Sequence, residues 1–128
     1  VKETFAQIKN ITLLFISAKN NKDVIKLKKI IYNKSQEKNK IISTSKLNSL
    51  LKKIAVEHSH PLVNGKSINF KYAVQISNSP ITIKIFSNFP KKIIKSYKNY
   101  LINKIIDKFD ITDSKVNLIF SATKNPFY

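Results

Sequence analysis

The sequence of 128 residues predicts an α+β domain preceded by a single strand–helix unit of the α/β kind. Two patterns lead to this prediction. Apolar and polar residues alternate in three segments, 68–76, 81–85 and 116–120, as they do in half-buried strands. Apolar residues recur at helical spacing in two other segments, one after Ser45 and one over residues 91–109. Two helices on one face of a three-stranded sheet would bury the apolar side of every strand.

The strand–helix unit is predicted from the segment ITLLFISAKNNKDVIKLKKIIYNK. Residues 12–16 form an apolar run typical of a buried strand, and a helix is expected from about Asp23 to Asn33. The apolar positions of that helix are Val24, Leu27, Ile30 and Ile31. Because one strand and one helix cannot bury both of their faces, we expect this unit to be the end of a larger α/β domain.

A polar stretch, SQEKNKIISTSKLN, separates this unit from the rest of the chain. The hydroxyl groups of residues 43–45 can cap the N-terminus of a helix. We therefore expect one domain to end near residue 38, a linker over residues 39–45, and a second domain over residues 46–128. The first helix of the second domain carries Leu47, Leu50, Leu51 and Ile54 on one face and ends before Pro61.

The alternation predicts which side chains of the second domain face its core. In the first strand these are Ile68, Phe70, Tyr72, Val74 and Ile76, with Asn69, Lys71, Ala73 and Gln75 on the other side. The long helix is expected to bury Ile94, Tyr97, Leu101, Ile105 and Phe109 and to expose Lys92, Lys95, Asn99 and Asn103. The face of the sheet away from the helices should then carry lysines, namely Lys71, Lys84 and Lys115.

The net charge of +17 favours an anionic partner. All 24 basic residues are lysines, and Ile and Asn are also abundant, a bias that an adenine- and thymine-rich genome would produce. Nucleic-acid binding and a solvated basic surface therefore both stay open. A protein that coats anionic membranes is disfavoured, because the apolar stripes would be buried in a core.

No apolar run approaches the roughly 18 to 20 residues of a membrane span. The chain has no cysteine, which excludes disulfides and thiolate metal sites.

The tripeptide Gly65-Lys66-Ser67 matches the end of a phosphate-binding loop, but its context does not. The preceding glycine of that loop is replaced by His60, and a strand rather than a helix is expected to follow Ser67. We therefore interpret the tripeptide as a turn.

Three other groups of polar or aromatic residues have a structural and a functional interpretation. Glu57, His58 and His60 could bind a metal but fit a helix end better. Asp107, Asp110 and Asp113 lack the spacing of a calcium loop and fit turns and a helix end. Tyr97 fits the core, whereas for Tyr100 core packing and base stacking both stay open.

The loop after the first strand contains Ser17-Ala18-Lys19, at the strand end where α/β folds bind ligands. In this context the tripeptide resembles the guanine-recognition element of GTPase domains. The segments ISTSKLN, HPLVNGKSINFKYAVQ, SYKNYLINKI and KNPFY, taken in order, resemble the carboxyl-terminal region of the Der (EngA) family of tandem GTPases. The resemblance runs from about Leu14 to Tyr128.

The resemblance implies that residues 1–38 are the end of a second G domain and that residues 46–128 form a KH-like domain. It implies guanine contacts by the backbone amides of Ser17, Ala18 and Lys19, and GTP and Mg²⁺ in the intact protein. It further implies a cytoplasmic protein that acts in assembly of the large ribosomal subunit. The expected partners are the rRNA of that subunit and the protein's own G domains, and no membrane.

The sequence departs from the family pattern in what it lacks. The phosphate loop, the switch residues and the Asn-Lys-x-Asp motif have no counterpart, so we expect this chain alone to be inactive, without catalytic or metal-binding residues. Its single glycine excludes the Gly-x-x-Gly clamp of standard KH modules. RNA binding through phosphates is then expected of Lys71, Lys84, Lys115, Lys92 and Lys95. The alternative is a stand-alone basic RNA-binding module without nucleotide chemistry.

Overall fold

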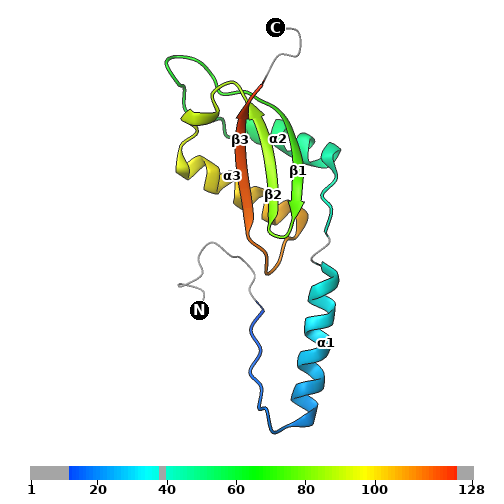
Figure 1. The fold of residues 1–128 in the computed structure, drawn as a ribbon. Helices are drawn as coiled ribbons and strands as arrows, with labels where there is room; N and C mark the ends of the chain where they lie inside the picture. Colours follow the sequence, from blue (N-terminus) through cyan, green and yellow to red (C-terminus); the bar gives the residue numbers. More distant parts are fainter. Residues whose placement is uncertain (1–11, 38–39, 124–128) are drawn as a thin grey trace.

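A computed structural model describes residues 12–37 and 40–123 (Figure 1). It contains helix α1 (Asn21–Glu37), and then α2 (Thr44–Glu57), β1 (Phe70–Asn78), β2 (Ile81–Ser87), a short 3-10 helix η1 (Pro90–Lys92), α3 (Lys95–Phe109) and β3 (Val116–Ala122). The predicted order of helix, strand, strand, helix and strand after residue 43 is confirmed. None of the described helices is long and apolar enough to span a membrane.

The three strands form one mixed sheet in the order β1-β2-β3. β1 and β2 are antiparallel, and β3 runs parallel to β2 because α3 carries the chain back between them. Helices α2 and α3 cover one face of the sheet (Figure 1). The core between these layers contains fully buried side chains from all of them, including Leu47, Ile54, Ile83, Ile85, Leu101 and Ile105. The predicted α+β architecture is therefore confirmed.

A β-bulge in β1 changes which of its residues face the core. Phe70 pairs with Ser87, but the next pair is Tyr72 with Phe86, so Lys71 is an extra residue. An extra residue moves the side chains after it to the opposite face, here as far as the second register shift of β1, between Gln75 and Ser77. Ala73 is consequently fully buried, whereas Tyr72 is 47% and Ile76 is 52% exposed. The prediction that Tyr72, Val74 and Ile76 face the core, and Ala73 and Gln75 the other side, is wrong for this reason.

The outer edge of β1 is covered by side chains that replace a neighbouring strand. The Asn48 carboxamide of α2 donates to the Ala73 carbonyl (2.9 Å) and accepts from the Ala73 amide (2.8 Å). These two bonds satisfy backbone groups that an uncovered edge would leave to solvent. The side chain of Gln75, which belongs to β1, accepts from the amide of Ile42 (2.7 Å) and so ties the segment before α2 to the strand.

Helix α3 begins later than the sequence pattern suggests. Residues Pro90–Lys92 form η1, and Ile94 is the N-cap residue of α3 and is 46% exposed. The neighbouring Ile93 is buried in its place. Ile94 is thus wrongly predicted as a core residue, because helical spacing was extended into a segment that is not yet an α-helix.

Residues 12–17 contain no strand, contrary to the prediction for residues 12–16. A strand needs a neighbour for its backbone hydrogen bonds, and the described residues offer none beside this segment. Phe15 is 93% exposed. The following helix α1 exists as predicted but is longer. Its Val24, Leu27 and Ile30 are half-buried, whereas Ile31 is exposed.

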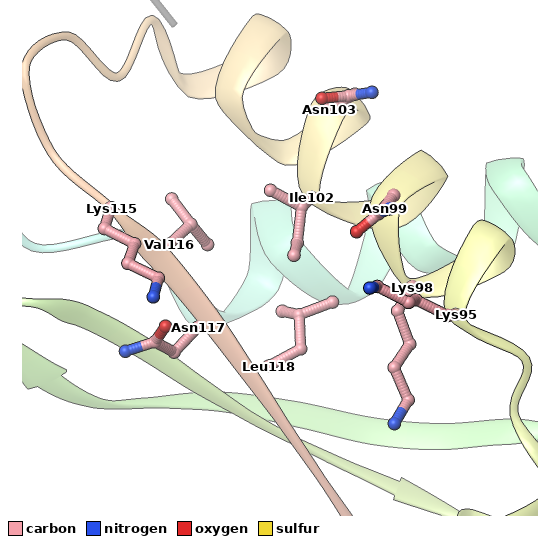
Figure 2. A pocket seen from close by; sticks show the side chains of 9 residues that line it. All are labelled: Lys95, Lys98, Asn99, Ile102, Asn103, Lys115, Val116, Asn117 and Leu118. Carbon is pink, nitrogen blue, oxygen red and sulfur yellow. The ribbon is translucent and has the colours of Figure 1, made fainter. Parts of the chain in front are cut away.

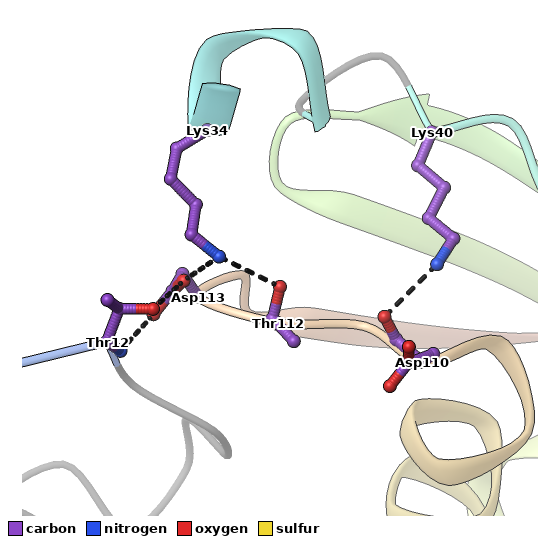
Figure 3. Close-up of polar contacts among 6 residues, drawn as sticks. All are labelled: Thr12, Lys34, Lys40, Asp110, Thr112 and Asp113. Atoms are coloured by element: carbon purple, nitrogen blue, oxygen red, sulfur yellow. Dashed lines mark hydrogen bonds and ion pairs between the residues drawn. The ribbon is translucent and has the colours of Figure 1, made fainter. Parts of the chain in front are cut away.

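Asp113, in the loop between α3 and β3, joins this first part of the chain to the second (Figure 3). Its carboxylate accepts from the Thr12 amide (2.7 Å) and hydroxyl (3.0 Å) and pairs with the Lys34 ammonium at 2.6 Å. Burial raises the pKa of this carboxyl, but the bonds from Lys34 and Thr12 and the charge of Lys34 outweigh burial, so the pKa lies below its ordinary value. Lys40 also donates to the carbonyls of Phe109 and Asp110.

Candidate nucleic-acid interface

A groove of about 540 Å³ runs between α3 and the outer edge of β3 (Figure 2). Residues 97, 101 and 105 anchor helix α3 on the sheet through their buried side chains. The adjacent face of the helix is thereby turned toward the groove. β3 is the last strand of the sheet in residues 12–37 and 40–123, and this part of the chain supplies no further strand to cover this side. The groove is lined by Lys95, Lys98, Asn99, Ile102, Asn103, Lys115, Val116, Asn117 and Leu118.

The lining combines cations, carboxamides and an apolar floor. Three lysines supply point charges, and three asparagines can both donate and accept hydrogen bonds. Among the residues that the structure describes, no acidic side chain lines the groove. The Lys98 ammonium lies 5.4 Å from the ring centre of Phe120, which orients it by a cation–π contact. Such a surface can hold phosphate groups against the lysines and the edges or faces of bases against the rest.

The structure divides the five lysines predicted from the sequence. Lys95 and Lys115 lie together in the groove, Lys92 is exposed in η1, and Lys84 lies on the face of the sheet away from the helices. Lys71 is the bulged residue of β1, at the far edge of the sheet. An RNA-binding role for these five lysines stays a prediction. Sequence reasoning also missed Lys98 and Asn117; the signal for Lys98 was its position one helical turn after Lys95.

Ser17, Ala18 and Lys19 form an exposed turn before α1. The Ser17 carbonyl accepts from the Asn20 amide (3.1 Å), and the Ser17 amide donates to the Asp23 carboxylate (3.1 Å). The Ser17 amide is thus engaged by the first turn of α1. A guanine-binding role for these three residues stays a prediction.

Gly65-Lys66-Ser67 belongs to a tight turn, as interpreted from the sequence. Val63 and Lys66 exchange two backbone hydrogen bonds, of 2.8 and 3.0 Å, around Asn64 and Gly65. Both central residues have positive φ, 51° and 73°, which Asn and Gly tolerate best. The only glycine of the chain therefore serves a turn and not a phosphate.

Both histidines of the chain and the two tyrosines of α3 are engaged in packing. His60 is buried, and its Nε2 accepts from the Ile94 amide (3.1 Å). Tyr97 is buried and donates to the His58 carbonyl (2.7 Å), and burial, with the nearby Tyr100, raises its pKa to about 12. Tyr100 is half-buried against the ring of His58. Among the described residues, no group of three His, Asp or Glu side chains could hold a metal ion.

Asp110 and Asp113 fit the turns that the sequence predicts for them. Asp110 caps the C-terminus of α3 in the left-handed conformation, and Asp113 also has positive φ. The ion pair of Asp113 with Lys34 was not foreseen.

The layered helices, the mixed three-stranded sheet and the groove beside β3 define a KH-like domain. The family described as the KH-domain-like, C-terminal domain of EngA bacterial GTPase enzymes matches residues 42–121, and the chain belongs to this family. Among its curated relatives is GTPase Der of Rickettsia canadensis (strain McKiel), 38% identical over 122 residues, which are 94% of this chain and 27% of that protein. GTPase Der of Rickettsia bellii (strain OSU 85-389) is 37% identical over 128 residues, or 99% of this chain and 28% of that protein. The resemblance noted in the sequence is confirmed, and the chain spans just over a quarter of these relatives.

Proposed function

We propose that this chain is the C-terminal part of a cytoplasmic GTPase of large-subunit assembly, and that its groove between α3 and β3 binds the rRNA backbone. The observation that supports this role is that Lys95, Lys98 and Lys115 line one groove, whose described lining contains no acidic side chain. Each lysine that neutralises a phosphate releases a counterion, so three of them supply affinity that depends on salt rather than on sequence. In the absence of a Gly-x-x-Gly loop, phosphate contact is the chemistry that the groove supports best.

Residues 1–38 are proposed to be the end of a G domain, joined by the linker 39–45 to a KH-like domain over residues 46–128. The support comes from the apolar side chains that the described part of this segment leaves uncovered, namely Phe15, Ile25, Ile31 and Tyr32. In soluble proteins, apolar groups gathered on one segment mark a surface for another part of the structure. The missing sheet neighbours of a G domain would cover them.

The intact protein is proposed to bind GTP and Mg²⁺, with Ser17, Ala18 and Lys19 beside the guanine. The chemistry of GTP hydrolysis needs residues that hold the phosphates, the metal and the attacking water, and this chain offers no counterpart for them. We therefore expect the chain alone to show background binding in equilibrium dialysis with labelled GTP. Saturable micromolar binding would contradict this assignment.

The groove is tested by replacing Lys95, Lys98 and Lys115 with glutamine in the full chain. The slope of log affinity for structured RNA against log salt should flatten by roughly two to three units. The matched control replaces three exposed helical lysines outside the groove, Lys26, Lys28 and Lys52. Fluorescence anisotropy with labelled RNA measures binding, and thermal melts verify the fold. Equal changes in the two triple variants would mean that the groove is not a site.

A further inference from the structure

The face of the sheet opposite α2 and α3 carries two neighbouring aromatic rings beside a lysine. Tyr72 of β1 and Phe86 of β2 are paired across the strands, with ring centres 6.4 Å apart and planes inclined by 34°. Lys84 lies two residues before Phe86 on the same face, and its ammonium is 5.3 Å from the centre of the Phe86 ring. We call Tyr72, Lys84 and Phe86 the aromatic platform.

The platform is not required by the core. The aromatic rings that stabilise the fold lie on the other face, where Phe70 contacts both Tyr97 and Phe120. Tyr72 is on the outer face only because of the bulge at Lys71, which turns it away from the helices. Bulges of this kind commonly redirect a side chain next to a functional site.

The surroundings of the platform fit a polyanion with flat apolar groups. Val74 and Ile119 lie on either side of Lys84 in the register, and Ile119 is 45% exposed. None of the three strands contains an acidic residue, and the whole chain carries a charge of +17. A protein partner would need an acidic surface with a matching apolar patch. Unpaired nucleotides supply both properties in every unit, because each has a negative phosphate and a base that stacks on aromatic rings.

The platform also adjoins the groove. Asn117 lines the groove, and in the sheet it pairs with Thr82, which shares the face of Lys84 and Phe86. A single strand held in the groove can therefore pass over the uncovered edge of β3 and reach the platform.

We propose that the aromatic platform is a second RNA contact, on which bases of an unpaired RNA segment stack on Tyr72 and Phe86 while Lys84 faces a phosphate. This inference rests on the proposed function, since it requires RNA as the partner. It adds a different chemistry, because stacking depends on bases and the lysine contacts of the groove depend on phosphates.

The chain contains no tryptophan, so Tyr72→Trp introduces a single fluorescent reporter at the platform. We expect its emission to be quenched when the full chain binds an unpaired RNA dodecamer, and to be unchanged by an abasic dodecamer of the same length. The control reporter is Tyr32→Trp, at an exposed aromatic position of α1. Emission of this reporter should respond to neither RNA.

Affinity is measured with Tyr72→Leu, which keeps an apolar side chain and removes the ring. Because the variant loses the stacking of one base on the ring, its affinity for the unpaired RNA should fall about 10-fold. The affinity for the abasic strand should not change, and Tyr32→Leu should change neither. Circular dichroism verifies that each variant is folded.

The outcomes separate this inference from the proposed function. If RNA binding depends on the groove lysines but Tyr72→Leu leaves it unchanged, the platform is refuted and the groove stands. If no RNA binds to the unaltered chain even at low salt, both proposals are overturned. If the Tyr72→Trp emission changes with protein concentration and not with RNA, a second copy of the chain covers this face, and the platform is refuted.

Discussion

The KH-like domain buries its apolar side chains, whereas the segment before it leaves similar side chains exposed. In the domain, Leu47, Ile83 and Leu101 are fully buried between the sheet and its two helices. In the first segment, Phe15 is almost fully exposed, and so are large parts of Ile25 and Ile31 of α1. The residue types are the same; what differs is whether the described chain supplies the opposing layer. An apolar pattern thus predicts a face that needs a partner, but not where the partner is.

The largest effect is expected from removing a core side chain of the domain. Leu101→Ala leaves a cavity between α3 and the sheet and should lower the free energy of unfolding by about 2–5 kcal/mol. Phe15→Ala removes a larger side chain from the first segment, yet it should change this free energy by less than about 0.5 kcal/mol. Urea denaturation followed by circular dichroism measures both. Similar losses in the two variants would show that Phe15 is buried in solution.

A smaller loss is expected where the domain closes its own sheet edge. Asn48→Ala would leave both backbone groups of Ala73 without their partner on α2, and should destabilise the domain by about 2 kcal/mol. Asn103→Ala is the matched control, because it replaces an exposed asparagine of α3 and should stay within about 0.5 kcal/mol of the unaltered chain. The same denaturation experiment compares them. If the two variants are equally stable, the edge contact contributes nothing.

The domain also contains a tyrosine whose pKa depends on folding. The folded-state pKa of Tyr97 is about 12, against an ordinary value of 10.0, so the unfolded chain loses this proton first as the pH rises. The stabilisation is complete below pH 10 and is lost between about pH 10 and 12. A shift of this size corresponds to at most about 3 kcal/mol, and screening by solvent lowers the expected loss to roughly 1–2 kcal/mol. Tyr97→Phe should show a flatter decline over this range in thermal melts. Every other ionisable group is the same in the variant and the unaltered chain, so the difference between the two declines reports Tyr97.

Much of the domain could be predicted because its elements follow simple periods. The core positions of α2 and the alternation in β2 and β3 were visible in the sequence, since helices repeat every 3.6 residues and strands every two. The bulge at Lys71 was not, because it exists only in the pairing of β1 with β2. One unseen extra residue was enough to reverse the predicted faces of Tyr72 and Ala73.

The groove was only half predictable for a similar reason. Lys95 and Lys115 were selected as exposed cations, but their meeting depends on the parallel return of β3 beside α3. Contacts across such sequence separations leave no local signal. The bond from Thr12 to Asp113 spans 101 positions and was equally invisible.

The smallest effect is expected at Asp113, which links the two regions. Asp113→Asn removes the charge that pairs with Lys34 and weakens the bonds from Thr12, and should cost less than about 1 kcal/mol of global stability, because the pair is partly exposed. Hydrogen exchange should nevertheless become faster at the Thr12 amide, while the buried strand β2 keeps its protection.

The same contact should depend on pH. Folding lowers the pKa of Asp113, so the stabilisation by its carboxylate is present above the ordinary value of 3.8 and is lost as the pH falls through the lower folded-state value. The unaltered chain at such acidic pH should therefore exchange at Thr12 like the variant, relative to the intrinsic rate at that pH. Unchanged exchange in the variant at neutral pH would show that the first segment is held by other contacts.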